Sequence, residues 1–147
     1  MIRPATHDDT PALVELGAKL HQISSYSAMD FNPAKAAQFL DALIDGLGVV
    51  FVAVVDGDVV GGFAGAVTEQ WFSDDLIAYD YSFFVDPARR QGLLSRKLAL
   101  AFQEWARIKG AKQLHMGVGT GLHVEATTRF YESLGLKHFG PLMMKEL

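Results

Sequence analysis

The sequence contains no cysteine among its 147 residues. This absence excludes a disulfide scaffold, a zinc site with thiolate ligands and a cysteine nucleophile. An excess of positive charge is also lacking, because 13 basic residues are set against 17 acidic ones and the net charge is -4. We therefore expect no strong overall attraction to nucleic acid or to an anionic membrane surface.

Long hydrophobic runs are lacking as well. The longest, Val49–Val55, has seven residues, whereas a helix that crosses a membrane needs roughly 20. The first residues become polar without an apolar stretch or a cleavage motif, so we predict no signal peptide. These features favour a cytoplasmic protein with neither a membrane nor a nucleic acid as its partner.

The composition that remains is ordinary for a globular protein. Half of the residues are hydrophobic and 20% are charged, which is typical of a chain that folds around a core. The length suits a single domain over residues 1–147. No internal repeat or low-complexity linker divides it.

Hydrophobic periodicity predicts a mixed α/β (α+β) fold with the element order β-α-α-β-β-β-α-β-α-β-β. Thr6 and Asp9 fit a capping box at the start of the first helix, and small residues at 61, 62, 64 and 65 indicate a closely approached strand backbone. The predicted elements are strand 2–4, helices 7–20 and 33–45, strands 49–55, 59–67 and 76–85, helix 91–108, strand 112–118, helix 122–134, and two short closing strands at 136–139 and 142–145.

Segment 83–98 contains the strongest functional signal. A strand ends there in a proline turn, and an amphipathic helix follows. The N-terminus of a helix offers unpaired N–H groups, and Gly92 lets a backbone approach a ligand closely. This pattern is typical of a phosphate site, and about equally of a solvated basic helix start. Four of the 13 basic residues are gathered in nine positions of this segment: Arg89, Arg90, Arg96 and Lys97.

Two motifs and the order of elements resemble the GCN5-related N-acetyltransferase (GNAT) family. The first is the loop 89–94, similar to the family's Arg/Gln-x-x-Gly-x-Gly/Ala, with Leu94 in place of the small last residue. The second is segment 129–136, similar to the family's aromatic-Tyr-x-x-Leu-Gly-Phe helix end. An Asn that the family often has upstream of the tyrosine is absent, and His123 and Val124 lie there instead.

The resemblance implies a mostly antiparallel mixed sheet in which one parallel pair of strands splays apart around acetyl-CoA. The pantetheine arm would pair with strand backbone at residues 83–85, and the pyrophosphate would rest on the N–H groups of residues 91–95. The hydroxyl of Tyr131 would point at the thioester sulfur. The residues so implied for acetyl-CoA binding are Phe83, Phe84, Val85, Arg89, Arg90, Gln91, Gly92, Leu93, Leu94 and Ser95.

The implied reaction is direct attack of an amine, of a small molecule or a peptide, on the thioester. Deprotonation of a lysine-type amine at pH 7 costs roughly 4–5 kcal/mol, and that of an α-amino group about 1. A carboxylate base would help, and Glu69 and Asp80 are the candidates, although such acids are more often simply solvated. A backbone N–H near Phe84 or Val85 would meet the oxyanion, and Tyr131 would act as general acid.

Other functions stay open at this point. The same fold could be a non-catalytic acyl-CoA-binding module. Glycines at 117, 119 and 121 between a strand and a helix suggest a dinucleotide-binding reductase, but Leu122 stands where that fingerprint needs its third glycine. The five scattered histidines predict no metal site. Four loop aromatics suit an acceptor pocket, the face of a homodimer or core packing: Tyr26, Phe31, Trp71 and Phe72.

Overall fold

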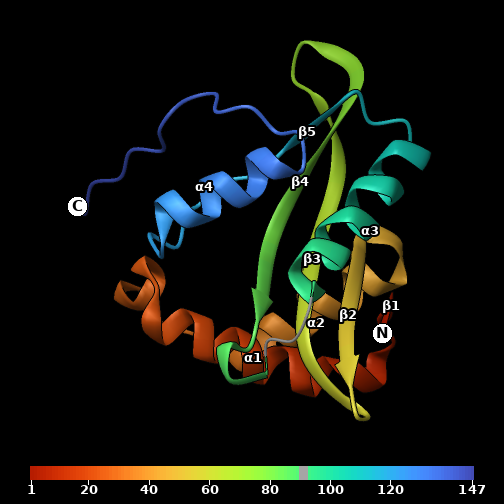
Figure 1. The fold of residues 1–147 in the computed structure, drawn as a ribbon, viewed down its shortest axis with the longest axis vertical. Coiled ribbons are helices and arrows are strands. Elements are labelled where there is room, and N and C mark those ends of the chain that lie inside the picture. Colours follow the sequence, from red (N-terminus) through yellow and green to blue (C-terminus); the bar gives the residue numbers. More distant parts are fainter. Residues whose placement is uncertain (90–92) are drawn as a thin grey trace.

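The computed structural model describes residues 1–89 and 93–147, so the expected ligand-binding residues Arg90, Gln91 and Gly92 lie outside the described residues. The described residues form a sheet with the strand order β1-β2-β3-β4-β5 (Figure 1). Neighbouring strands from β1 to β4 are antiparallel to each other, and β5 pairs with β4 in parallel. The strands are β1 (Ile2–Pro4), β2 (Val49–Val55), β3 (Asp58–Gln70), β4 (Ser73–Val85) and β5 (Gln113–His115).

Helices pack against both faces of this sheet. One face packs against α3 and α4, and the other packs against α1 and the segment that follows α2. The predicted order of strands and helices is confirmed as far as the helix at residues 124–133. The helices are α1 (Thr10–Ile23), α2 (Pro33–Ala42), α3 (Leu94–Ile108) and α4 (Val124–Ser133), with short helical turns η1 (His7–Asp9), η2 (Ser25–Ala28), η3 (Leu43–Leu47) and η4 (Pro87–Arg89).

The capping box predicted at the first helix is formed. The N–H of Thr6 donates to the Asp9 carboxylate at 2.8 Å, and the Arg3 guanidinium of β1 donates to the same carboxylate at 2.7 Å. The hydrogen bond from Arg3 is the main reason that the pKa of Asp9 lies below its usual value. These contacts fasten the start of the helical layer to the first strand.

The core on the α3 face is centred on two stacked rings. Phe63 of β3 and Phe102 of α3 are fully buried, with their ring centroids 4.3 Å apart. A Cβ atom on Gly65 would lie 2.5 Å from the Phe102 ring. The small residues of β3 are therefore needed to bring the helix this close, as the sequence predicts.

The prediction of two closing strands is wrong. Residues 136–147 contain no regular structure, and the side chains of Phe139 and Leu142 are exposed. A strand depends on ladder hydrogen bonds to a neighbour, and within the described residues none of 137–147 takes part in a backbone hydrogen bond. The strand expected at 112–118 is also shorter, because β5 pairs with β4 over three residues only.

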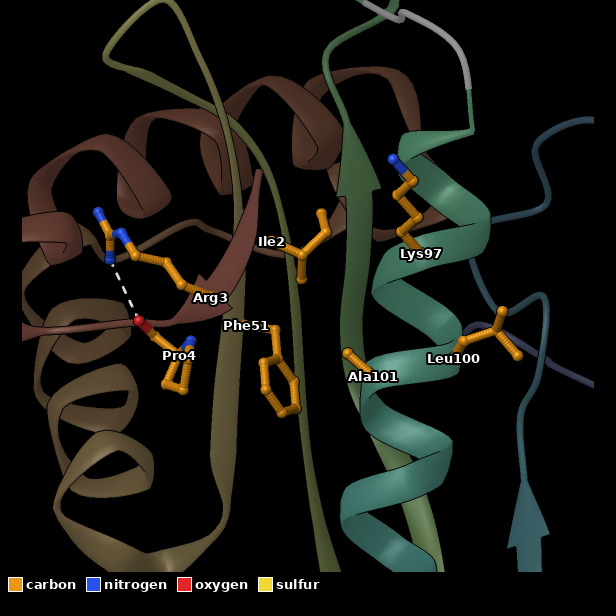
Figure 2. A pocket seen from close by; sticks show the side chains of 7 residues that line it. All are labelled: Ile2, Arg3, Pro4, Phe51, Lys97, Leu100 and Ala101. Carbon is orange, nitrogen blue, oxygen red and sulfur yellow. Dashed lines mark hydrogen bonds between the residues drawn. The ribbon is translucent and has the colours of Figure 1, made fainter.

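A shallow apolar groove lies at the opposite edge of the sheet from β5. Figure 2 shows it between β1 and α3, with Lys97 on the side of α3 that faces β1. Lys97 therefore points away from the β4–β5 edge. The groove is lined by Ile2, Arg3, Pro4, Phe51, Lys97, Leu100 and Ala101.

Candidate active site

The parallel strands β4 and β5 part after a short contact. Their pairing begins with Ile77 opposite Gln113 and ends with Tyr79 opposite His115, whereas β4 continues to Val85. The edge of β4 beyond Tyr79 therefore has no strand partner on this side within the described residues. Such a free edge can accept an extended chain as an added strand. The predicted splayed parallel pair is thus confirmed.

A β-bulge disturbs β4 at the same place. Ala64 pairs with Ser82 and Gly65 pairs with Asp80, so Tyr81 is an extra residue without a partner on β3. A bulge bends its strand and re-aims the side chains around it. The strand therefore changes direction where β5 leaves it.

Asp80 and Tyr131 lie on the α3–α4 face, where the charge of Asp80 acts on Tyr131. Burial raises the pKa of Asp80 to about 6, although the backbone N–H groups of Asp80 and Gly117 oppose this change. Tyr131 of α4 is 9% exposed, and its pKa is raised mainly by burial and further by the charge of Asp80. At pH 7, Asp80 can thus accept a proton while Tyr131 keeps one to donate. Both shifts have the same main cause, which is the burial of the two groups.

The other predicted base, Glu69, lies elsewhere. Its side chain is exposed near the end of β3, opposite Leu76. It is four residues along β3 from Gly65, the partner of Asp80, which corresponds to roughly 13 Å. The structure therefore brings Asp80, and not Glu69, together with Tyr131 beside the gap.

The end of β4 presents its backbone to the gap and its large side chains to the core. The Phe83 ring lies 4.9 Å from that of Phe63 and 6.2 Å from that of Phe130. Val85 is 2% exposed. Phe84 is half-buried and pairs with β3. Contact of this segment with a ligand would therefore come from main-chain N–H and C=O groups, which any sequence supplies.

The start of α3 is anchored in the core, and no side chain among the residues that the structure describes caps it. Leu94 is buried in the core, whereas Leu93 is exposed and has no polar group to offer the first turn. Ser95 is half-buried beside them. A helix start without a cap leaves backbone N–H groups available to an anion.

The basic residues around this helix start differ in their contacts. The Arg89 guanidinium lies 3.2 Å from the exposed carboxylate of Asp58. Because exposed ion pairs contribute little, Arg89 can exchange this partner for a phosphate. Arg96 donates at 3.5 Å to the carbonyl of Ser133 and so connects α3 with the end of α4.

An aromatic cluster on the opposite face was missed by the sequence analysis. The hydroxyls of Tyr79 and Tyr81 are 3.0 Å apart. The Phe39 ring of α2 packs edge-on against Tyr81, with centroids 4.8 Å apart. Alternation along β4 could have placed the two tyrosines on one face, but their contact with Phe39 is a feature of the tertiary structure.

The loop aromatics have separate positions. Tyr26 lies in η2, and the neighbouring Ser25 donates to the carbonyls of Thr120 and Gly119 at 2.9 and 2.6 Å, which ties η2 to the loop before α4. Phe31 packs near His21. Trp71 and Phe72 are 93% and 68% exposed between β3 and β4, so this pair is not part of the core.

Neither a metal cluster nor a membrane span is found in the part of the chain that the structure describes. Residues 1–89 and 93–147 contain no group of three side chains suited to bind a metal ion. Nor does any helix within them combine the length and the hydropathy needed to cross a membrane.

Comparison with known proteins supports the family that the sequence motifs resemble. A family model described as an acetyltransferase (GNAT) domain matches residues 46–137, more than half of the chain. No curated protein matches the sequence. The similar solved structures described next share only about a fifth of their residues with this chain, so they show its fold.

Three solved structures illustrate this likeness. An acetyltransferase of Trypanosoma brucei is 21% identical, with a TM-score of 0.76 over 100% of this chain and 99% of that one. A tetramutant of a Bacillus halodurans protein is 20% identical, with a TM-score of 0.80 over 100% and 99%. An aminoglycoside acetyltransferase from an uncultured soil metagenomic sample, in complex with sisomicin, is 20% identical, with a TM-score of 0.74 over 100% and 95%.

Proposed function

This chain belongs to the GNAT acetyltransferase family, and from that premise we propose that it transfers the acetyl group of acetyl-CoA to an amine of a small molecule or a peptide. The observation that supports this most is the gap between β4 and β5, with Asp80 and Tyr131 beside it. The attacking amine requires a group that accepts its proton, and Asp80 is a carboxylate that can do so. The departing thiolate requires a proton donor, and Tyr131 is a phenol that is protonated at pH 7.

The chain offers two surfaces that fit acetyl-CoA. The unpaired edge of β4 suits the amide groups of the pantetheine arm. The uncapped start of α3 suits the diphosphate, with Arg89 close by. Arg90, Gln91 and Gly92 complete the predicted phosphate site, because their sequence follows the family's loop.

In the proposed reaction, a C–N bond forms at the acetyl carbon and the C–S bond of the thioester breaks. Asp80 accepts the proton of the attacking amine, directly or through a water molecule. Tyr131 donates its proton to the sulfur, and a backbone N–H near Phe84 or Val85 holds the oxyanion. A thiol with a pKa of about 8.5 is a good leaving group, so the contribution of Tyr131 lies at the lower end of the usual range for acid catalysis, about 10²-fold.

One structure similar in fold is an aminoglycoside acetyltransferase solved with sisomicin, which favours a small-molecule amine. The cytoplasmic location and the homodimer stay predictions. Size-exclusion chromatography with light scattering tests the second.

Binding and turnover together test the proposal. Acetyl-CoA, but not NAD(P), should raise the melting temperature, and at least one member of a panel of amines, polyamines, amino acids and peptides should release free CoA thiol. Tyr131→Phe should lower kcat by about 10²-fold and leave the stabilisation by acetyl-CoA unchanged. Binding without turnover of any amine would favour an acyl-CoA-binding module, and stabilisation by NAD(P) alone would favour a reductase.

A further inference from the structure

The two faces of β4 differ at the point where β5 leaves it. Side chains alternate along a strand, so Asp80 shares the face of α3 and α4 while Tyr79 and Tyr81 share the face of α2. On the first face, Phe83, Phe130 and Tyr131 are packed together. On the second, Tyr81 is 49% exposed. An acceptor that approaches the gap from solvent therefore meets Tyr81.

Tyr81 belongs to an aromatic cluster of three rings. Its ring is edge-on to that of Phe39 at 4.8 Å and to that of Tyr79 at 5.1 Å. Phe39 is itself 37% exposed. The cluster thus combines an accessible apolar surface with a pair of hydroxyls that hydrogen-bond each other at 3.0 Å. Aromatic rings attract both other rings and ammonium groups.

The two carboxylates nearest this cluster in the sequence make their contacts away from its rings. Asp80 lies on the opposite face of the sheet, where its charge acts on Tyr131, and Asp41 of α2 accepts a hydrogen bond from the Thr10 hydroxyl at 2.6 Å. A polyamine or an aminoglycoside carries several positive charges, which call for several carboxylates in a binding site. A single ammonium on an apolar carrier suits a surface made of rings and phenol hydroxyls.

We propose that the Phe39–Tyr79–Tyr81 cluster selects the acceptor, and that the acceptor is a primary amine carried by an aromatic ring, an arylalkylamine. The inference rests on the proposed function, since it assigns the acceptor side of the same gap. The ring of the acceptor packs against Tyr81 and Phe39, and its amine extends past the bulge toward the thioester.

Steady-state thiol release tests this with matched amines. Phenethylamine should exceed propylamine, spermidine and kanamycin in kcat/KM by at least tenfold, about the discrimination that one apolar contact supplies. Tyr81→Ser and Phe39→Ala should remove that preference by raising KM for phenethylamine. Neither should change kcat for propylamine or the stabilisation by acetyl-CoA. Tyr81→Phe keeps the ring and should retain the preference.

The control is Phe139→Ala, which removes a fully exposed ring from the C-terminal segment and should change nothing. A preference for spermidine or kanamycin, or an unaltered preference in folded Tyr81→Ser and Phe39→Ala, would overturn the inference and leave the proposed function standing. Absence of thiol release with every amine would instead refute the proposed function, and the inference with it.

Discussion

Replacement of Asp80 by Asn should stabilise the protein at neutral pH and impair its chemistry. Burial raises the pKa of this carboxyl from 3.8 to about 6. A difference of about 2 pH units corresponds to about 3 kcal/mol, which is the cost of keeping the carboxylate ionised in the native state. Asn has nearly the same shape and no charge, so Asp80→Asn should recover up to about 3 kcal/mol. At about 3 °C per kcal/mol for a chain of this size, the melting temperature should rise measurably.

The sign of the effect depends on pH. Above about pH 6, Asp80 is ionised in both the native and the unfolded state. The buried charge then lowers the free energy of unfolding by the full amount. As the pH falls from about 6 to 3.8, the native state binds a proton that the unfolded state does not, and the cost disappears. The difference in melting temperature between the Asn variant and the wild type should therefore be largest at pH 8 and only a small fraction of that at pH 4.

Activity supplies the second measurement. If Asp80 is the base, kcat/KM for the wild type should fall below about pH 6. Asp80→Asn should lower it by about 10²–10⁴-fold at pH 8 and abolish this acid limb. A melting difference that is independent of pH would refute the assignment of the raised pKa. A limb with its midpoint near pH 6 that persists in the variant would refute the role of Asp80 as base, whereas the titration of the amine itself lies at higher pH.

Three further predictions concern ligand binding and packing. Replacement of Arg89 or Arg90 by Ala should weaken acetyl-CoA binding by about 1–3 kcal/mol, as measured by calorimetry, because a charge-assisted bond to phosphate is lost. Gly92→Val should also impair binding, since a branched side chain would occupy the space that a phosphate needs; its melting temperature should stay within a few degrees of wild type. Gly65→Ala should destabilise the fold by about 1–3 kcal/mol in urea titrations, because the new methyl group would overlap the Phe102 ring.

The matched control for the arginines is Arg107→Ala near the other end of α3. Arg107 is exposed and pairs with Glu104 at 2.7 Å, so its loss should leave the affinity for acetyl-CoA unchanged. Equal losses from Arg107 and Arg89 would mean that general charge, and not a phosphate site, governs binding. A folded Gly92→Val that binds acetyl-CoA normally would remove this loop from the ligand site.

Local signals in the sequence were sufficient to predict most of the helices and strands. The capping box of Thr6 and Asp9 and the small residues of β3 each depend on neighbours within a few positions or on alternation along one strand. Periodicity reports which face of an element is buried. These features and two short motifs were enough to indicate the fold and the family.

The choice between the two acids, by contrast, was a matter of tertiary structure. In the sequence, Asp80 lies within a predicted strand and Glu69 lies in the loop beside it. The pKa of Asp80 is raised because elements distant in the chain bury it beside Tyr131. The contact of Phe39 with Tyr81 likewise joins α2 to a bulge in β4. Desolvation and packing depend on what lies across space, which no local pattern of residues reports. The sequence alone determined which elements and motifs exist, and only the tertiary structure decided which side chains meet at the gap.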